Sequence, residues 1–305
     1  MITFFEALEI NPLLLAAVLA GLAASVVSGI VGSYIVVKRI AFIGGSISHS
    51  VLSGIGVCIW LERTQGITWV SPLLGALIAA AASALLIGWI HLHHREREDS
   101  AIACIWSIGM AIGIVFISQT PGFNVELTNF LIGNILWVSK TDLYILTALD
   151  LSVVLLVLFL HKRLLTLCFD EEQARLQGVP VNQFYILLLL LIAISIVLLV
   201  QVVGIVLVMT MLTIPAAIAN LLTTRLSNMM ILAVFLSALF CLSGNIVAYY
   251  ADWPTGATIA LIAGGVYILS LSCFRYGIAT KKTKEEKRTE REGFEPSIPF
   301  RGMRP

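Results

Sequence analysis

The chain has 305 residues, of which 59% are hydrophobic and 12% charged, and its formal net charge is +1 at pH 7. Soluble domains carry about 25% charged and about 45–50% apolar residues, so this composition excludes an ordinary soluble protein and predicts a chain that crosses a membrane several times. The five cysteines are scattered singly, which indicates neither a disulfide framework nor a thiolate metal site, and we expect membrane lipid but no nucleic acid as a partner.

Charged residues mark the ends of the predicted membrane helices. From Leu176 to Thr224 the chain has no Asp, Glu, Lys, Arg or His. One crossing needs about 20 residues, so this stretch must cross twice, and Gln201–Gly204 is the best place for a reversal. The sequence therefore predicts an all-α, polytopic membrane protein with about 8–9 transmembrane helices. In chain order, the predicted spans cover residues 12–37, 40–61, 70–91, 101–118, 142–161, 183–202, 204–224, 228–250 and 255–275.

Three hydrophilic segments interrupt this pattern. Residues 122–138 are too polar and too short for a full crossing, and we expect a partly inserted or re-entrant piece. Residues 162–182 form the longest internal cytoplasmic loop, in which the acids and the closing glycine of "DEEQARLQG" predict a short surface helix over Glu171–Gln177. We expect residues 1–280 to form one membrane domain and the charged residues 281–305 to be a disordered cytoplasmic tail without a function.

Lysine and arginine side chains predict the orientation, because they are enriched in cytoplasmic loops. With nine spans they gather on one side of the membrane, which makes that side the cytoplasm, with the N-terminus outside and the C-terminus inside. The positions that carry this argument are Lys38–Arg39, Arg95, Arg97, Lys162–Arg163, Arg175, Arg225, Arg275 and Lys281–Lys282.

The sequence lacks several common motifs of nucleotide binding and hydrolytic catalysis. It contains no G-x-x-x-x-G-K-[ST] and no H-E-x-x-H, so it predicts neither ATP binding by a P-loop nor a zinc protease. Ser46 or Ser48 beside His49 invites an intramembrane hydrolase interpretation, but no G-x-S-x-G elbow frames them. Away from the ends of the predicted spans, two ionisable residues remain, His49 and Asp150, and such residues are functional candidates because their burial in lipid is costly.

His49 lies near the middle of its predicted span. Gly45, Ser46, His49 and Ser53 share one helix face, which is small and polar. Small residues let a second helix approach closely and also leave room for a hydrated ion. Neutral imidazole is a common ligand of zinc, copper, iron and nickel, so this face predicts either a packing histidine or a metal ligand.

Two other polar positions leave alternatives open. Asp150 is either buried in its span or interfacial, if the helix begins later than drawn. His91, His93 and His94 at the end of the third span form either a flanking polar cluster or a metal-handling group at the exit.

At six places the chain resembles the metal-ion permeases of bacterial ABC importers, the family that carries zinc, manganese or iron. The first segment resembles the signature basic–x–x–x–x–Gly–Asp–x–x–x–His–x–x–x–x–Gly, and all six occur in the expected order within residues 12–275. They are "KRIAFIGGSISHSVLSGIGV", "EREDSAIACIWSIGMAIGIV", "FLIGNILWVSKTD", "FDEEQARLQGVPV", "QVVGIVLVMTMLTIPAAIANLL" and "DWPTGATIAL".

The resemblance implies a type II ABC importer-like permease in the bacterial inner membrane, which is not itself an enzyme. Two permeases would pair around the ion path, an extracytoplasmic metal-binding protein would deliver the ion, and separate ATPase subunits would drive transport into the cytoplasm. The transported ion would be zinc, manganese or iron, and no cofactor would be permanently bound. Its expected ligand is His49, with Ser46 nearby, and the expected ATPase-coupling residues are Glu171, Glu172, Ala174 and Gly178.

The chain departs from the family signature at Gly45, where the family has Asp. Glycine offers no side-chain ligand, so we expect the second permease to be a different chain that retains both Asp and His, giving a heterodimer. Alternatively, Asp150 supplies the missing carboxylate. A competing function is a self-sufficient secondary metal or solute carrier with Asp150 as the coupling group.

Overall fold

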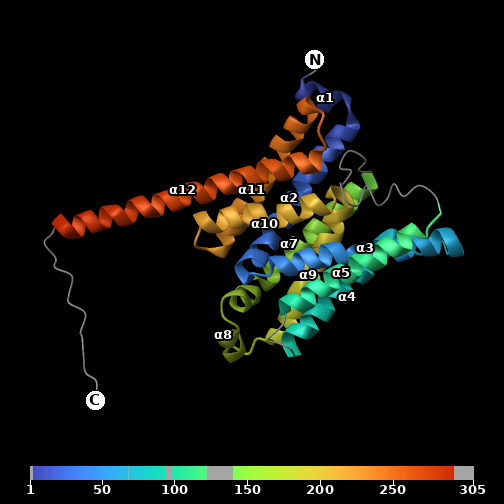
Figure 1. Cartoon of the computed structure of the whole chain (residues 1–305), viewed down its shortest axis with the longest axis horizontal. Helices are drawn as coiled ribbons and strands as arrows, with labels where there is room; N and C mark the ends of the chain where they lie inside the picture. The colour runs from blue at the N-terminus through green and yellow to red at the C-terminus, as the bar shows by residue number, and fades with distance from the viewer. Residues whose placement is uncertain (1–2, 68, 94–97, 122–139, 292–305) are drawn as a thin grey trace. The chain divides into compact units, whose positions relative to one another are not determined.

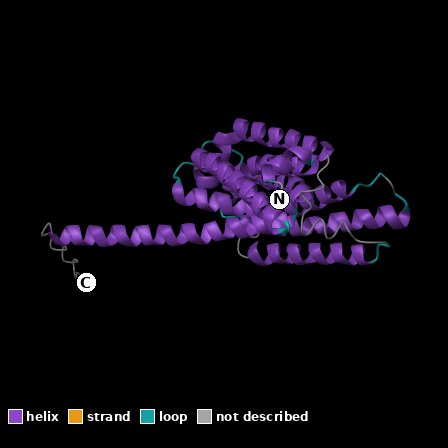
Figure 2. Ribbon diagram, turned by 90° about the horizontal axis from the view of Figure 1, so that it is seen from above, coloured by secondary structure: helices purple, strands orange, loops and turns teal. Residues whose placement is uncertain are grey.

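The computed structural model describes residues 3–67, 69–93, 98–121 and 140–291. Within these ranges every regular element is an α-helix (Figure 2). The predicted re-entrant segment at 122–138 lies outside the described residues. The helices are α1 (Phe4–Ile10), α2 (Pro12–Lys38), α3 (Ala41–Gln65), α4 (Pro72–His93), α5 (Glu98–Ser118), α7 (Lys140–Phe169), α8 (Glu171–Leu176), α9 (Val181–Val203), α10 (Ile205–Leu222), α11 (Leu226–Ala251) and α12 (Thr255–Arg291).

The predicted membrane spans are confirmed. In the described part of the chain, 9 helices are long and apolar enough to cross a membrane, namely α2 to α5, α7 and α9 to α12. Among these candidate spans, the largest difference is in α7, where the span continues to Phe169 although the predicted one ends at residue 161. Leu164 and Leu167 are fully buried, so the helix continues to bury an apolar face beyond Lys162 and Arg163.

The break between the two uncharged spans falls at Gly204. Helix α9 ends at Val203 and α10 begins at Ile205, with φ 79° and ψ 164° at the glycine between them. Glycine adopts positive φ at no steric cost, whereas a side chain there would be strained. The break therefore lies inside the predicted stretch Gln201–Gly204.

Helix α2 is central to the unit formed by residues 1–264. It packs against α7, α10 and α11, while α3 packs chiefly against α4 and α5. A Cβ atom on Gly32 of α2 would overlap the carbonyl oxygen of Leu212 in α10. Such close backbone approach is typical of membrane helices. Their association depends on van der Waals packing rather than on a hydrophobic driving force, so small residues are enriched where they meet.

The contact between α3 and α4 also depends on glycine. A Cβ atom on Gly54 would overlap the carbonyl oxygen of Gly75, and the reverse substitution would do the same. We expect Gly54→Ala to destabilise the protein by about 1–3 kcal/mol, because overpacking must displace backbone. Thermal unfolding in detergent measures this effect. Gly264→Ala, with nothing within 4 Å of its added Cβ, is the control; equal midpoints for both variants would contradict the prediction.

Helix α12 continues through the predicted domain boundary at residue 280. Residues 281–291 lie within this helix, and Lys, Glu and Arg are good helix formers. Residues 292–305 lie outside the described residues. The domain limit at residue 280 and the assignment of 281–305 as a disordered tail without a function stay predictions.

Candidate metal path and cytoplasmic coupling surface

His49 is half-buried on α3 and lies against α5. Its imidazole stacks on the indole of Trp106, with ring centroids 4.5 Å apart and planes 13° from parallel. The two helices run side by side (Figure 1) and approach closely because α5 has small residues: a Cβ atom on Gly109 would lie 2.7 Å from the Cα atom of Ser50. The glycine contact thus brings Trp106 against the histidine.

The serine hydroxyls on this part of α3 are bound to backbone carbonyls. Ser46 is fully buried and donates to the carbonyl of Ile102 in α5 at 2.9 Å. Ser48 donates to the carbonyl of Gly44 at 2.9 Å, and Ser53 donates to that of Ser50 at 2.7 Å. Ser46 therefore fastens α3 to α5, which favours a packing role over metal binding for its hydroxyl. The same bonds leave no serine arranged as a nucleophile beside His49.

Position 45 faces the same region as His49. A Cβ atom on Gly45 would lie 3.3 Å from Cε of Met209 in α10 and 3.4 Å from Cζ3 of Trp106. The sulfur of Met209 also accepts a hydrogen bond from the Ser48 hydroxyl at 3.5 Å. The position of the family carboxylate is thus bordered by a thioether and an indole, and both are ends of side chains rather than backbone.

Asp150 is buried inside the protein, with 7% of its surface exposed, and α7 begins ten residues before it, at Lys140. It lies on α7, which packs chiefly against α2 and α9, whereas α3 has α4 and α5 as its main neighbours. Over the described ranges, no three His, Cys, Asp or Glu side chains gather in a group that could hold a metal ion. The structure of this one chain therefore does not bring Asp150 together with His49 in such a group.

The two described histidines at the end of α4 have different neighbours. His91 stacks on Tyr185 of α9, with centroids 4.1 Å apart. The Nδ1 atom of His93 lies 2.9 Å from the carbonyl oxygen of Trp89, one turn earlier. His94 falls outside the described residues. This geometry favours a flanking polar cluster over a shared metal group.

The predicted surface helix is confirmed as α8. The Asp170 side chain caps it by accepting a hydrogen bond from the backbone N–H of Gln173 at 2.9 Å, as Asp commonly does at a helix start. Ala174 is fully buried and holds the helix on the body of the protein. The helix ends one residue earlier than predicted, at Leu176.

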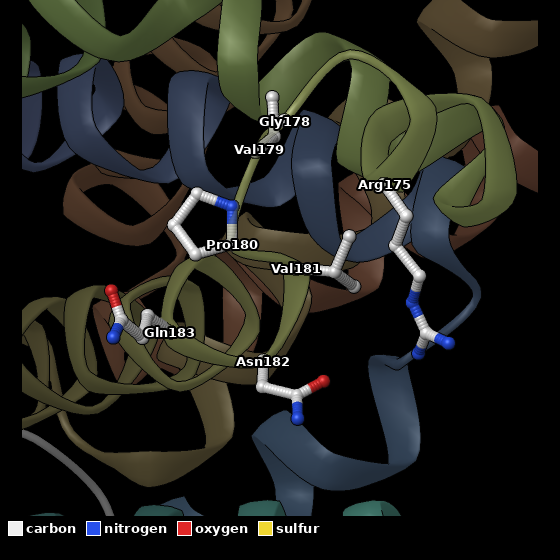
Figure 3. Close-up of a pocket in the computed structure, with 7 residues that line it drawn as sticks. All are labelled: Arg175, Gly178, Val179, Pro180, Val181, Asn182 and Gln183. Carbon is white, nitrogen blue, oxygen red and sulfur yellow. The ribbon is translucent and has the colours of Figure 1, made fainter.

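The surface next to α8 is polar and open. Glu172 is exposed, and Gly178 has φ 75°, which turns the chain toward α9. A pocket of about 560 Å³ follows this turn, and Figure 3 shows that its lining comes from the end of α8 and the start of α9, including Arg175 and Asn182. Together these features shape the exposed surface beside α8.

An ion pair joins α8 to the end of α2. The Lys38 Nζ atom donates to Oε1 of Glu171 at 2.5 Å and to the carbonyl of Leu167 at 3.0 Å. Burial raises the pKa of Glu171, but the hydrogen bond and charge of Lys38, with the charges of His91 and Arg175, hold that pKa below its usual value. The carboxylate is therefore ionised at neutral pH, and the pair is lost only as the pH falls through the lowered pKa.

Comparison with known proteins identifies relatives over nearly the whole chain. The ABC 3 transport family matches residues 11–274. A "probable metal transport system membrane protein" of Chlamydia trachomatis is 47% identical over 260 residues, covering 85% of this chain and 88% of the relative. The "manganese transport system membrane protein MntC" of Halalkalibacterium halodurans is 34% identical over 267 residues, covering 88% and 89%.

Solved structures show the same arrangement of helices. A chain of PsaBC from Streptococcus pneumoniae, solved in complex with Fab, is 30% identical with a TM-score of 0.77, covering 88% of this chain and 94% of that one. A putative metal-chelate type ABC transporter in an inward-facing conformation is 17% identical with a TM-score of 0.67, covering 85% of each chain. The second likeness shows the fold alone.

Proposed function

The chain belongs to the ABC 3 transport family, and we propose that it is the permease subunit of an ATP-driven importer that moves a divalent transition metal ion into the cytoplasm. The observation that carries the proposal is His49, a half-buried imidazole held against Trp106 among helices long enough to cross a membrane. Manganese is the first ion to test, since a relative is named as a manganese transport protein; zinc and iron follow.

The proposed complex contains four kinds of component. This chain and a second permease line the path, ATPase subunits dock around α8 on the cytoplasmic side, and an extracytoplasmic protein delivers the ion. The N-terminus lies outside and the C-terminus in the cytoplasm. Gly45 supports a heterodimer, because a partner with both Asp and His would supply the carboxylate that this chain lacks. Three protein ligands and one open position are usual for labile metal sites.

Purification of the intact complex tests its composition. Mass spectrometry of the co-purified subunits is expected to find an ATPase and a second permease with an Asp–His pair. Finding an ATPase and this permease alone would still support the importer but would refute the heterodimer. The decisive functional test is uptake of manganese, zinc and iron into proteoliposomes with and without ATP. Uptake without any ATPase would instead support the secondary carrier, which family membership disfavours.

The docking role of α8 predicts that reversing one of its exposed charges weakens binding of the ATPase. We expect Glu172→Lys to reduce co-purification of the ATPase several-fold, because an exposed charge on a docking surface is reversed. Glu9→Lys, which reverses an exposed acid at the proposed outer side, is the matched control. Wild-type recovery of the ATPase with Glu172→Lys would refute the docking assignment of this residue.

A further inference from the structure

We infer that Lys38 is a positioning residue that couples α8 to the metal path. Through its ion pair with Glu171 it links the proposed ATPase-docking helix to the corner between α2 and α3, and α3 carries His49. The inference rests on the proposed function. It adds that movement of α8 is transmitted toward the ion path through one contact, the Lys38–Glu171 ion pair.

The first step is that Lys38 joins three helices at one atom. It is the last residue of α2, and its Nζ atom donates both to the first residue of α8 and to the carbonyl of Leu167 in the last turns of α7. A cation is favoured at a helix C-terminus, where carbonyl groups are left without partners. The lysine and glutamate side chains are 13% and 29% exposed, so solvent screens the pair less than it would a fully exposed one.

The second step is that the corner after Lys38 is closed by its own hydrogen bonds. Arg39 adopts the left-handed conformation, with φ 61° and ψ 32°, and its N–H bonds back to the carbonyls of Ile35 and Val36. The N–H of Ile40 also bonds to the carbonyl of Ile35, at 3.0 Å. Helix α3 starts at Ala41. A displacement of the end of α2 is therefore passed directly to the start of α3.

The third step is the short path from this corner to the histidine. His49 lies eight residues after Ala41 on an unbroken helix, which corresponds to about 12 Å along the axis at about 1.5 Å per residue. Packed helices move as rigid elements, so tilting the start of α3 changes how His49 sits against Trp106.

The fourth step is that α8 is short and packs on α7 and α9, while the ion pair with Lys38 joins it to α2. It has 6 residues, and Ala174 is its buried residue. The cap at Asp170 and the glycine turn at Gly178 hold its two ends, but neither reaches α2 or α3. The ion pair with Lys38 therefore adds a direct contact from this small helix to α2, at the corner that leads into α3.

The test is the number of ions transported per ATP hydrolysed by the complete importer in proteoliposomes. Lys38→Gln keeps a long polar side chain without the charge. We expect it to retain the bound ATPase and to lower the ratio about tenfold, within the usual range of coupling between sites. Lys162→Gln, which removes an exposed cation from the same end of α7, is the control and should leave the ratio unchanged.

Exchanging the charges of Lys38 and Glu171 distinguishes coupling through the ion pair from mere attachment of α8 to the protein. The double variant Lys38→Glu/Glu171→Lys restores an ion pair of opposite sense and is expected to recover most of the ratio that Lys38→Glu loses. This comparison also serves if Lys38→Gln fails to fold. The inference is overturned if the Lys38→Gln complex folds and transports with the wild-type ratio. It is also overturned if this variant loses the ATPase, or if the exchange variant folds but its transport stays uncoupled from ATP hydrolysis. If the wild-type complex moves no metal, the proposed function itself fails.

Discussion

Replacement of His49 by alanine is expected to abolish metal uptake while the ATPase remains bound to the complex. His49 lies on α3 between the Gly45 position and Ser53, and it offers imidazole nitrogens, which suit transition metals such as zinc and iron. Loss of an outer residue that merely orients a metal ligand costs about 10–100-fold, so loss of the ligand itself should reduce uptake by about 100-fold or more. Radioactive metal uptake into proteoliposomes measures the effect.

Two control variants distinguish a metal ligand from a packing residue. His49→Phe keeps an aromatic ring to stack on Trp106 but has no nitrogen, so it should fail as completely as His49→Ala. Ser53→Ala removes a hydroxyl on the same face that donates to the carbonyl of Ser50, and it should transport normally. Full uptake by His49→Phe would assign the histidine to packing and would remove it from the ion path.

Much of the fold was predictable because membrane helices must avoid unpaired charge. The uncharged stretch ending at Thr224 had to contain two crossings, and its break lies at Gly204 as the sequence indicates. The end of α7 was not predictable by the same argument. Lys162 and Arg163 lie on a helix that continues, because Leu164 and Leu167 pack inward while the two charged side chains are exposed.

The candidate site was predictable only along its own helix. The spacing of Gly45, Ser46 and His49 placed them on one face, as observed, but the partners of that face come from distant parts of the chain. Trp106 and Met209 belong to α5 and α10, and neither residue type signals an ion path by itself. Likewise, no local pattern pairs Lys38 with Glu171, since the contact arises from tertiary packing.

The same limit applies to Asp150. The sequence could not decide whether the residue is interfacial or buried, because that depends on where α7 begins in the membrane. The structure places it inside the protein, on a helix whose main neighbours are α2 and α9. Its burial keeps it as a candidate functional group, and Asp150→Asn with full transport would exclude it as the source of the missing carboxylate.

Gly45→Asp is expected to strengthen metal binding by the purified permease. The added carboxylate would lie one turn before His49 on the same face, and carboxylate oxygen is a preferred ligand of manganese. Its Cβ atom would come 3.3 Å from Met209 Cε and 3.4 Å from Trp106 Cζ3, so those side chains must yield by a few tenths of an ångström. The flexible methionine can do so, and we expect manganese affinity to rise about tenfold, equivalent to about 1.4 kcal/mol.

Gly45→Ala isolates the steric effect, because it adds the same Cβ atom without a carboxylate. Equilibrium binding of manganese to both variants, with and without the proposed second permease, then tests why this chain has glycine at the position. A gain for Gly45→Asp but not for Gly45→Ala would show that the carboxylate is what this chain lacks. The gain should be larger for this permease alone than with a partner that already brings an Asp–His pair. Equal affinities for the two variants would mean that position 45 does not face the ion, and the argument from Gly45 to a heterodimer would then fail.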